Sequence, residues 1–302
     1  MSSTETAHEG RSARANAERR LGWMLCAPAV TVMLVVTAYP IAYAVWLSLQ
    51  RYDLRFPDDR EFIGLANYAS VLSSSQWWDS VLSTVIITVF SVIIELVLGF
   101  TLAWVMHRAI FGRGLVRAST LIPYGIITVV AALAWKFAFD PTTGFVNGLL
   151  GTDTAWFGAR WSSFFVIILT EIWKTTPFMA LLLLAGLTLV PNDLLQAARV
   201  DGASAFQRFT RVTLPLMKPA ILVALLFRTL DAFRVFDSVY VQTRGAEGTE
   251  TVSITGYKTL ITRLNLGLGS AVSVLVFIAV LLIAGLFVKG FGANLDQQQG
   301  EV

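Results

Sequence analysis

Cysteine and histidine are scarce in this sequence of 302 residues, which contains one cysteine and two histidines. With Cys26 alone, the chain can form no intrachain disulfide and no multi-cysteine metal site. His8 and His107 are far apart in the sequence and do not have the spacing of paired metal ligands. The pattern G-x-x-x-x-G-K-[ST] is missing too, which excludes nucleotide binding through a P-loop. We therefore expect no metal site, no cofactor held by this chain and no enzymatic activity of its own.

Charged residues are also few, at 14% of the chain, whereas hydrophobic residues make up 55%. This hydrophobic share exceeds what a soluble domain of this length needs for its core, so the surplus is expected to face lipid. The net charge is only +3, and the basic residues are scattered over short loops. A nucleic-acid-binding surface needs a denser basic patch. The composition predicts a single all-α membrane domain.

Six hydrophobic stretches are long enough to cross a bilayer, which requires about 20 mostly apolar residues per helix. The first follows a basic run, as a signal peptide does, but it is long and no small-residue cleavage site closes it. Cys26 lacks the preceding small residues of a lipidated cysteine, which disfavours lipoprotein processing. We expect spans at 22–48, 81–106, 119–139, 163–190, 219–241 and 269–289, within a membrane domain of residues 19–290 flanked by tails 1–18 and 291–302.

Lysine and arginine are distributed unevenly between the two sides of these spans. With the N-terminus placed in the cytoplasm, the cytoplasmic segments contain twelve of these residues and the outer segments seven. The positive-inside rule therefore predicts that both termini are cytoplasmic. Pro40, Pro123 and Pro177 fall within predicted spans, where each either kinks its helix, as a translocation pathway would use, or is simply tolerated.

The polar segment 191–219, between the fourth and fifth spans, has the signals of two short helices on the cytoplasmic side. Asn192 or Asp193 can cap the first helix, and Gly202 can supply the positive φ that ends it. Ser204 can cap the second helix, and Pro215 is expected to stop it. The segment is predicted to form a helical hairpin.

This hairpin combines apolar and basic side chains, which suits docking into a groove on another protein. An amphipathic helix that lies on the membrane surface is the alternative, and the pattern does not decide between them. The apolar residues are Leu194, Leu195, Ala198, Phe206 and Phe209, and the basic ones are Arg199, Arg208 and Arg211.

The runs Gln196-Ala197-Ala198, Asp201-Gly202-Ala203 and Leu214-Pro215 resemble the EAA loop of the permeases of binding-protein-dependent ABC importers. In that family the loop is a coupling helix that seats in a cleft of the ATPase subunit. The resemblance implies the same role here for Gln196, Ala197, Ala198, Asp201, Gly202, Ala203, Phe206, Arg208 and Phe209. Gln196 stands where the family usually has glutamate.

Other segments extend the resemblance over nearly the whole chain, to sugar permeases of the maltose and glycerol-3-phosphate type. They are 62–68, with a G-L-x-N-Y pattern, 144–150, with G-x-x-N-x-L-L, and 228–240 in the fifth span. The resemblance implies a type I importer permease in the bacterial cytoplasmic membrane that takes up a sugar, a disaccharide such as trehalose. It also implies a second permease subunit, two ATPase subunits that bind ATP and Mg, and an extracytoplasmic sugar-binding lipoprotein.

Several ionisable residues lie inside the predicted spans, where each costs about 2.5–3.5 kcal/mol and so needs a partner, a wet cavity or a function. Glu95 is in the second span and has no partner there, so we expect it to pair with another helix, in this chain or in a partner subunit. The fourth span contains Glu171 and Lys174, and the fifth contains Arg228, Asp231, Arg234 and Asp237. We assign Arg228 and Asp237 mainly to packing.

Two helix faces combine such charges with an aromatic ring, as a sugar site would, because charged groups bind hydroxyls and a ring covers the apolar face of a pyranose. The predicted substrate-binding residues are Glu171, Lys174, Thr175 and Phe178 in the fourth span and Phe227, Asp231, Arg234 and Ser238 in the fifth. The competing interpretation is that the charges three residues apart, Glu171 with Lys174 and Asp231 with Arg234, only neutralise each other along their helices or bind a neighbouring span.

Two other functions fit parts of this pattern. An ion-coupled secondary transporter could carry protons on Glu95, Glu171 and Asp231. An intramembrane enzyme would need a His/Glu metal constellation or a Ser/His pair within the spans, and the sequence has neither. The importer permease, which would alternate between outward-open and inward-open states, is the preferred interpretation.

Overall fold

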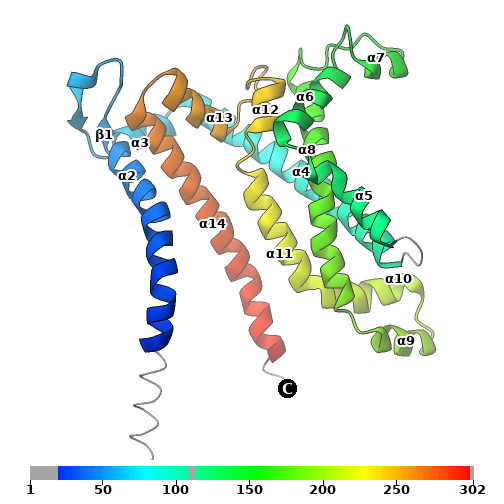
Figure 1. Ribbon diagram of the computed structural model, residues 1–302. Helices are drawn as coiled ribbons and strands as arrows, with labels where there is room; N and C mark the ends of the chain where they lie inside the picture. The colour runs from blue at the N-terminus through cyan, green and yellow to red at the C-terminus, as the bar shows by residue number, and fades with distance from the viewer. Residues whose placement is uncertain (1–19, 109–112, 300–302) are drawn as a thin grey trace, which may run out of the picture.

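The computed structural model describes residues 20–108 and 113–299 and is helical over most of this length (Figure 1). The first described helix, Arg20–Ser48, contains η1 (Leu34–Ala38) and α2 (Tyr39–Ser48). The predicted tail 1–18 and the end of the predicted C-terminal tail lie outside the described residues. The later elements are β1 (Gln50–Arg51), η2 (Pro57–Asp59), β2 (Glu61–Phe62), α3 (Ala66–Leu72), α4 (Ser75–Arg108), α5 (Arg113–Gly125), α6 (Thr128–Ala138), α7 (Phe145–Leu150), α8 (Arg160–Thr188), α9 (Asn192–Val200), α10 (Ala205–Arg208), η3 (Phe209–Thr213), α11 (Leu214–Ala232), α12 (Asp237–Gln242), α13 (Val252–Tyr257), η4 (Lys258–Thr262) and α14 (Leu266–Gln299).

Five helices in the described part of the chain are long and apolar enough to span a membrane, and a bent pair makes a sixth. This agrees with the six predicted spans. The third span, predicted over 119–139 with Pro123 either kinking it or tolerated, is bent: Ala118–Gly125 and Thr128–Ala138 meet at an angle of 90°. Hydropathy could not reveal the bend because the residues on both sides of it are apolar. The sixth predicted span, 269–289, matches the apolar helix Leu266–Gly290, and the helix α14 itself continues to Gln299, into the segment predicted as a tail.

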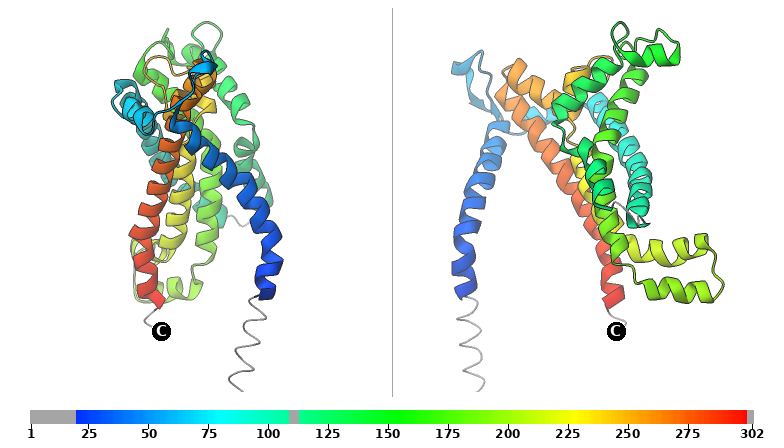
Figure 2. Two further views of the ribbon diagram at one scale, coloured as in Figure 1. Left: turned by 90° about the vertical axis from the view of Figure 1, so that its left-hand side faces the viewer. Right: turned by 45° about the vertical axis from the view of Figure 1, so that its right-hand side comes forward.

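The described start of the chain, the end of α14 and the α9–α10 hairpin all lie at one end of the molecule (Figures 1 and 2). The opposite end carries the short β1–β2 pair, α3, α7, α12 and α13. An even number of spans places both ends of a chain on the same side. The hairpin therefore lies on the side of the termini, as the predicted topology requires.

Two asparagines of the family-like motifs hold the loops at the end opposite the hairpin. The Asn67 side-chain amide donates to the carbonyl oxygens of Ser48 and Gln50, at 2.8 Å each, and so joins α3 to the end of the first span. Asn147 donates to the Thr154 carbonyl and accepts a hydrogen bond from the indole of Trp156 at 2.7 Å. Both are buried. These motif positions therefore have a structural role in this chain.

The centre of the fold is the packing of α4, α8 and α11. Its buried side chains include Ala103, Met106, Met179, Ala180, Leu183, Leu187, Met217 and Ala224. Small residues allow close approach, as is common between membrane helices. A Cβ atom at Gly99 would lie 2.8 Å from Met179 Cγ, and one at Gly186 would collide with the Cβ of Ala220 on α11.

Gly186→Ala is accordingly expected to destabilise the protein by about 1–3 kcal/mol, because the added methyl group forces α8 and α11 apart. Equilibrium unfolding in detergent measures this. Gly285→Ala is the matched control, since a Cβ at Gly285 of α14 meets no atom within 4 Å. Equal stability of the two variants would contradict the close helix contact.

Candidate functional site

The guanidinium of Arg228, near the end of α11, is almost completely buried, with a side-chain exposure of 1%. Its Nε lies 2.5 Å from Glu95 Oε2 on α4, its Nη2 lies 3.0 Å from Glu171 Oε2 on α8, and its Nη1 lies 2.8 Å from Asp231 Oδ2. Glu95 also accepts a hydrogen bond from Thr175 Oγ1 at 2.7 Å. One guanidinium thus joins three spans.

Glu95 was expected to pair with another helix, in this chain or in a partner subunit. Its partner is Arg228, in the same chain. Glu171 and Asp231 both form ion pairs with Arg228. For Glu171 this is the predicted alternative of a partner on a neighbouring span, whereas Asp231 pairs with the residue three positions before it on α11 and not with Arg234. A fully buried ion pair is stabilising only when its remaining polar atoms are hydrogen-bonded. Here Thr175 and Ser238, which donates to Glu171, supply such bonds. The packing role assigned to Arg228 agrees with this geometry.

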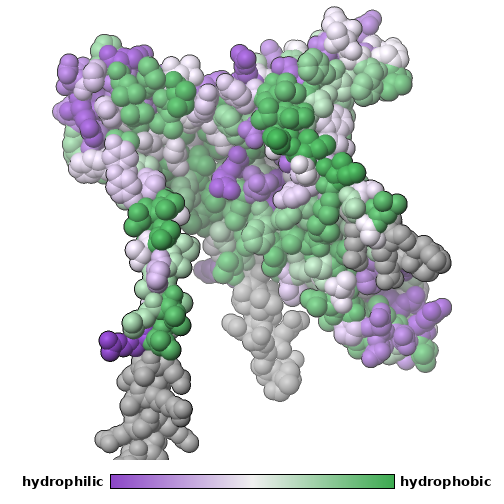
Figure 3. Space-filling model, in the orientation of Figure 1, coloured by the Kyte–Doolittle hydropathy of each residue, from purple (hydrophilic) through white to green (hydrophobic). Residues whose placement is uncertain are grey.

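A cavity of about 410 Å³ opens directly beside the cluster. Asp231 belongs to both, since it pairs with Arg228 and yet its side chain is 66% exposed. Figure 3 shows a hydrophilic patch interrupting the hydrophobic surface where α11 gives way to α12. The lining residues are Tyr124, Thr128, Glu171, Lys174, Thr175, Asp231, Arg234, Val235, Phe236, Asp237 and Ser238.

Two interrupted spans form the walls of this cavity together with α8. Tyr124 and Thr128 flank the bend between α5 and α6. The fifth span is interrupted too, because α11 ends at Ala232 and α12 begins at Asp237. Irregular backbone at membrane depth is tolerated where it is covered by protein or lines a wet cavity, and discontinuous spans commonly form transport sites.

Of the eight predicted substrate-binding residues, six line the cavity: Glu171, Lys174, Thr175, Asp231, Arg234 and Ser238. Phe178 lies behind the wall and stacks on Tyr124, with ring centroids 5.4 Å apart, while Lys174 Nζ lies 5.5 Å from the same ring. Phe227 is outside the cavity, with 56% exposure. Phe227 was predicted to bind substrate because the helical repeat places it on the same face of the fifth span as Asp231.

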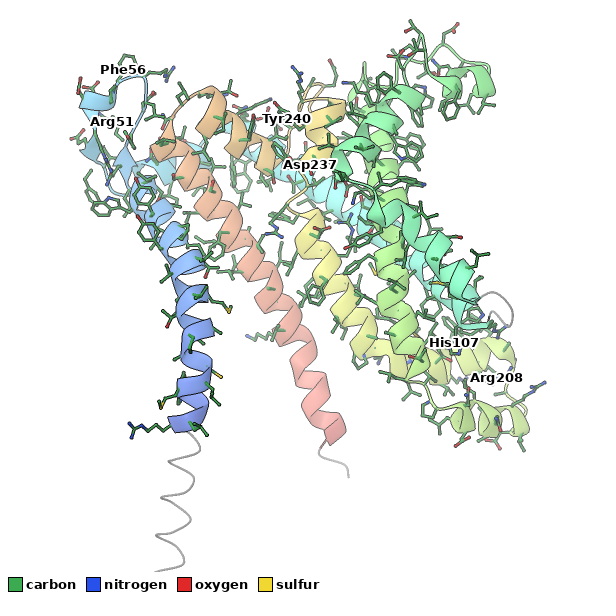
Figure 4. All side chains as sticks on the ribbon, in the orientation of Figure 1. Arg51, Phe56, His107, Arg208, Asp237 and Tyr240 are labelled. Carbon is green, nitrogen blue, oxygen red and sulfur yellow. The ribbon has the colours of Figure 1, made fainter. Side chains whose placement is uncertain are left out.

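Sequence reasoning did not propose five of the lining residues: Tyr124, Thr128, Val235, Phe236 and Asp237. Four of them are adjacent to or within an interruption of a span, which a continuous hydropathy run conceals. Pro123 followed by Gly125 was the available signal for the bend. Asp237 was assigned to packing, but it starts α12 and lines the cavity together with Phe236; Figure 4 shows it beside Tyr240.

The second predicted site, the 191–219 segment, is a hairpin of α9 and α10. Gly202 has φ +80° between the two helices, and Ser204 caps α10 in a reciprocal pair with Gln207, as predicted for both positions. The capping of α9 by Asn192 or Asp193 is wrong, because Pro191 is its N-cap and no side chain closes it.

The stop predicted at Pro215 is also wrong. The chain continues from α10 through η3 directly into α11, and Pro215 lies in the first turn of α11. Pro215 directly follows the π-helical segment η3, where the regular hydrogen-bond pattern of an α-helix is already interrupted. The hairpin is thus continuous with the span that carries Arg228 and Asp231.

The predicted coupling residues divide between two surroundings. Gln196, Arg208 and Phe209 line a second cavity, between the hairpin and the end of α4. Phe209 packs against Phe100 and Trp104, with centroids 5.2 and 5.8 Å away. The others lie along the rest of the hairpin: Ala197, Asp201, Gly202 and Phe206 are exposed, and Ala198 and Ala203 are half-buried.

Comparison with known proteins covers nearly the whole chain. Residues 62–300 match the family of binding-protein-dependent transport system inner membrane components. The chain is 56% identical to the trehalose transport system permease protein SugA of Mycobacterium tuberculosis H37Rv, over 96% of this chain and 94% of that protein. It is 42% identical to the trehalose/maltose transport system permease protein MalF of Thermococcus litoralis, over 90% and 94%.

Solved structures agree on the fold. A bacterial ABC transporter that imports the acidic polysaccharide alginate contains a chain with a TM-score of 0.77 and 20% identity, covering 92% of this chain and 96% of that one. The MetNI methionine ABC transporter gives a TM-score of 0.52 at 21% identity, over 72% and 93%. This chain therefore belongs to the binding-protein-dependent transport system inner membrane components, the multi-spanning permease subunits of ABC transporters.

Proposed function

We propose that the chain is the permease subunit of an ATP-driven importer for a sugar, a disaccharide such as trehalose, and that it forms half of the translocation pathway. The observation that carries the proposal is its 56% identity, over almost its full length, to a trehalose permease. A second relative, at 42%, is a trehalose/maltose permease. The polar cavity beside Asp231 supports the same assignment, because carboxylates, hydroxyls and aromatic rings together suit a sugar.

Alternating access is supported by the continuous helix that connects the hairpin to the cavity beside Asp231. From Ala205 to Ala232 the chain is helical without interruption, through α10, η3 and α11. At 1.5 Å per residue this rod is about 40 Å long. It ends beside Asp231 and the break that lines the cavity. A displacement of the hairpin by a motor would therefore move a wall of the substrate cavity, since a packed helix transmits motion as a unit.

The partners follow from surfaces that this chain leaves exposed. Leu194, Val200 and Phe206 of the hairpin are exposed, Val200 by 88%, and suit a groove on an ATPase subunit that binds ATP and Mg. The first span, Arg20–Ser48, is apolar and none of its most hydrophobic stretch is buried within this chain (Figure 2). A second permease subunit and lipid would cover it. An extracytoplasmic sugar-binding protein would deliver the substrate.

Reconstitution tests the proposal. The chain would be placed in vesicles with its second permease, the ATPase pair and the binding protein, and uptake of labelled trehalose would be measured. Uptake that requires ATP and the ATPase subunits is expected. Uptake by the permease alone, driven by a proton gradient, would instead establish the ion-coupled alternative.

Substitution of the cavity charges gives a residue-level prediction. Asp231→Ala and Arg234→Ala are each expected to reduce uptake by about tenfold, the loss of about one charge-assisted hydrogen bond to a hydroxyl. Assembly of the complex should be unaffected, because both side chains are exposed to the cavity. Asp153→Ala, at an exposed loop carboxylate away from the cavity, is the control. Normal uptake by both cavity variants would reject the sugar site.

A further inference from the structure

The corner between the end of α4 and the α9–α10 hairpin contains a second cavity, of about 380 Å³, which shares no lining residue with the cavity beside Asp231. Four basic side chains from three helices line it, and no aspartate or glutamate of the described chain does. The basic residues are His107, Arg108, Arg199 and Arg208. Figure 4 shows His107 and Arg208 at this corner. The cavity therefore has the charge to hold an anion.

Packing holds two of these cations in place before any ligand arrives. The Arg108 guanidinium lies 4.5 Å from the Trp104 ring centroid, and Arg208 Nη1 donates to the Ala203 carbonyl at 2.5 Å. Each guanidinium has five N–H donors, so donors remain for a ligand. Arg108 and Arg199 are also in the last turns of α4 and α9, where they offset the negative end of the helix dipole, whereas Arg208 is in the first turn of the continuous α10–α11 helix. A dipole end amounts to only about half a charge, so the cavity stays net positive.

The position of the cavity indicates where the anion comes from. It lies where the spans α4 and α8 end, at Arg108 and Thr188, and tryptophan lines it, as is usual where hydrocarbon meets headgroups. The rest of its wall is largely apolar, with Leu187, Val190, Leu195 and Phe209. Exposed apolar side chains such as Leu98 and Val105 continue along α4 toward the middle of the span. Acyl chains could follow this surface.

We propose that this cavity binds the phosphate of an anionic phospholipid at the membrane surface. Basic pockets at the ends of membrane helices recognise such headgroups, and arginine pairs with phosphate in a bidentate manner. The exposed hairpin side chains Leu194, Val200 and Phe206 do not line this cavity. These three exposed side chains are therefore separate from the cavity, whereas the predicted coupling residues Gln196, Arg208 and Phe209 line it. The bound lipid would contact both α4 and the hairpin and so stabilise their relative position.

Gln196→Glu is the sharpest test, because it places a carboxylate among the arginines with almost no change of shape. Gln207→Glu is its matched control: Gln207 is on the same hairpin, outside the cavity, and glutamate preserves its cap with Ser204. The full-length chain in neutral detergent would be examined by native mass spectrometry with phosphatidylglycerol, phosphatidylcholine or inorganic phosphate. Selective retention of phosphatidylglycerol is expected, weakened about fivefold or more by Gln196→Glu and unchanged by Gln207→Glu.

Arg199→Gln should weaken retention to a similar degree, and it removes an exposed side chain that the fold does not need. Equal retention of phosphatidylcholine and phosphatidylglycerol would overturn the proposal, as would retention that neither Gln196→Glu nor Arg199→Gln changes. Binding of inorganic phosphate with no preference for the lipid would overturn it too, in favour of a soluble anion.

Discussion

Arg228→Met is expected to reduce the free energy of unfolding by about 3–5 kcal/mol, because it leaves the carboxylates of Glu95 and Glu171 buried without their common cation. Methionine has a comparable length, so loss of packing contributes little. Equilibrium unfolding of the chain in detergent measures the change. Arg234→Met is the matched control, since Arg234 lies six residues further on, is exposed and lines the cavity.

The double variant Glu95→Gln with Arg228→Met separates charge from volume. Neutralising Glu95 removes one of the two buried charges that the single variant leaves unpaired. The double variant should therefore be more stable than the sum of the two single changes predicts, by at least about 1 kcal/mol. Strict additivity, or an Arg228→Met variant as stable as Arg234→Met, would mean that the ion pairs contribute nothing to the fold.

Gly202→Trp is expected to abolish most of the ATP-driven uptake, by tenfold or more, while ATP hydrolysis by the complex continues. Gly202 joins α9 to α10 with φ +80°, a conformation that costs other residues roughly 1–2 kcal/mol. No atom lies within 4 Å of a Cβ added there, so the indole would project outward from the tip of the hairpin. A groove shaped for this tip could not accept it. Uptake and hydrolysis measured on the same reconstituted complex give the ratio of transport to ATP used.

Gly202→Ala separates the two effects of this substitution. Alanine carries the same backbone cost but adds almost no volume, so it should retain more of the uptake than tryptophan does. Charge reversal at the neighbouring Asp201 should also impair coupling. Normal uptake by Gly202→Trp would show that the hairpin tip enters no groove, and the docking assignment would fail.

The charged residues of the spans illustrate the limit of local reasoning. Glu171 with Lys174 and Asp231 with Arg234 are three residues apart and were considered either as pairs along one helix or as partners of a neighbouring span that the sequence could not name. Arg228 instead forms ion pairs with Asp231 on its own helix and with carboxylates from two other spans. Helical spacing shows which residues share a face, but it cannot show which face meets which neighbouring helix.

In the 191–219 segment, the features that depend on adjacent residues could be predicted from the sequence. The turn at Gly202 and the cap at Ser204 depend on a few adjacent residues, and both are present. The continuation past Pro215 was missed because proline is unfavourable inside an α-helix, whereas here it follows the π-helical segment η3. Where α11 begins depends on its packing against α4 and α8, and the residues of those two helices lie outside the 191–219 segment.

The sequence by itself determined that the chain has six membrane spans, that a helical hairpin connects the fourth span to the fifth, and which family the chain resembles. Those properties follow from hydropathy, turn residues and motifs, which act over short stretches of chain. Tertiary structure alone decided that Arg228 joins α4, α8 and α11, and that the interrupted third and fifth spans line one cavity. The reason is physical: a charge in a low-dielectric interior must find its counter-charge in space, and residues 133 positions apart in the chain supply it here.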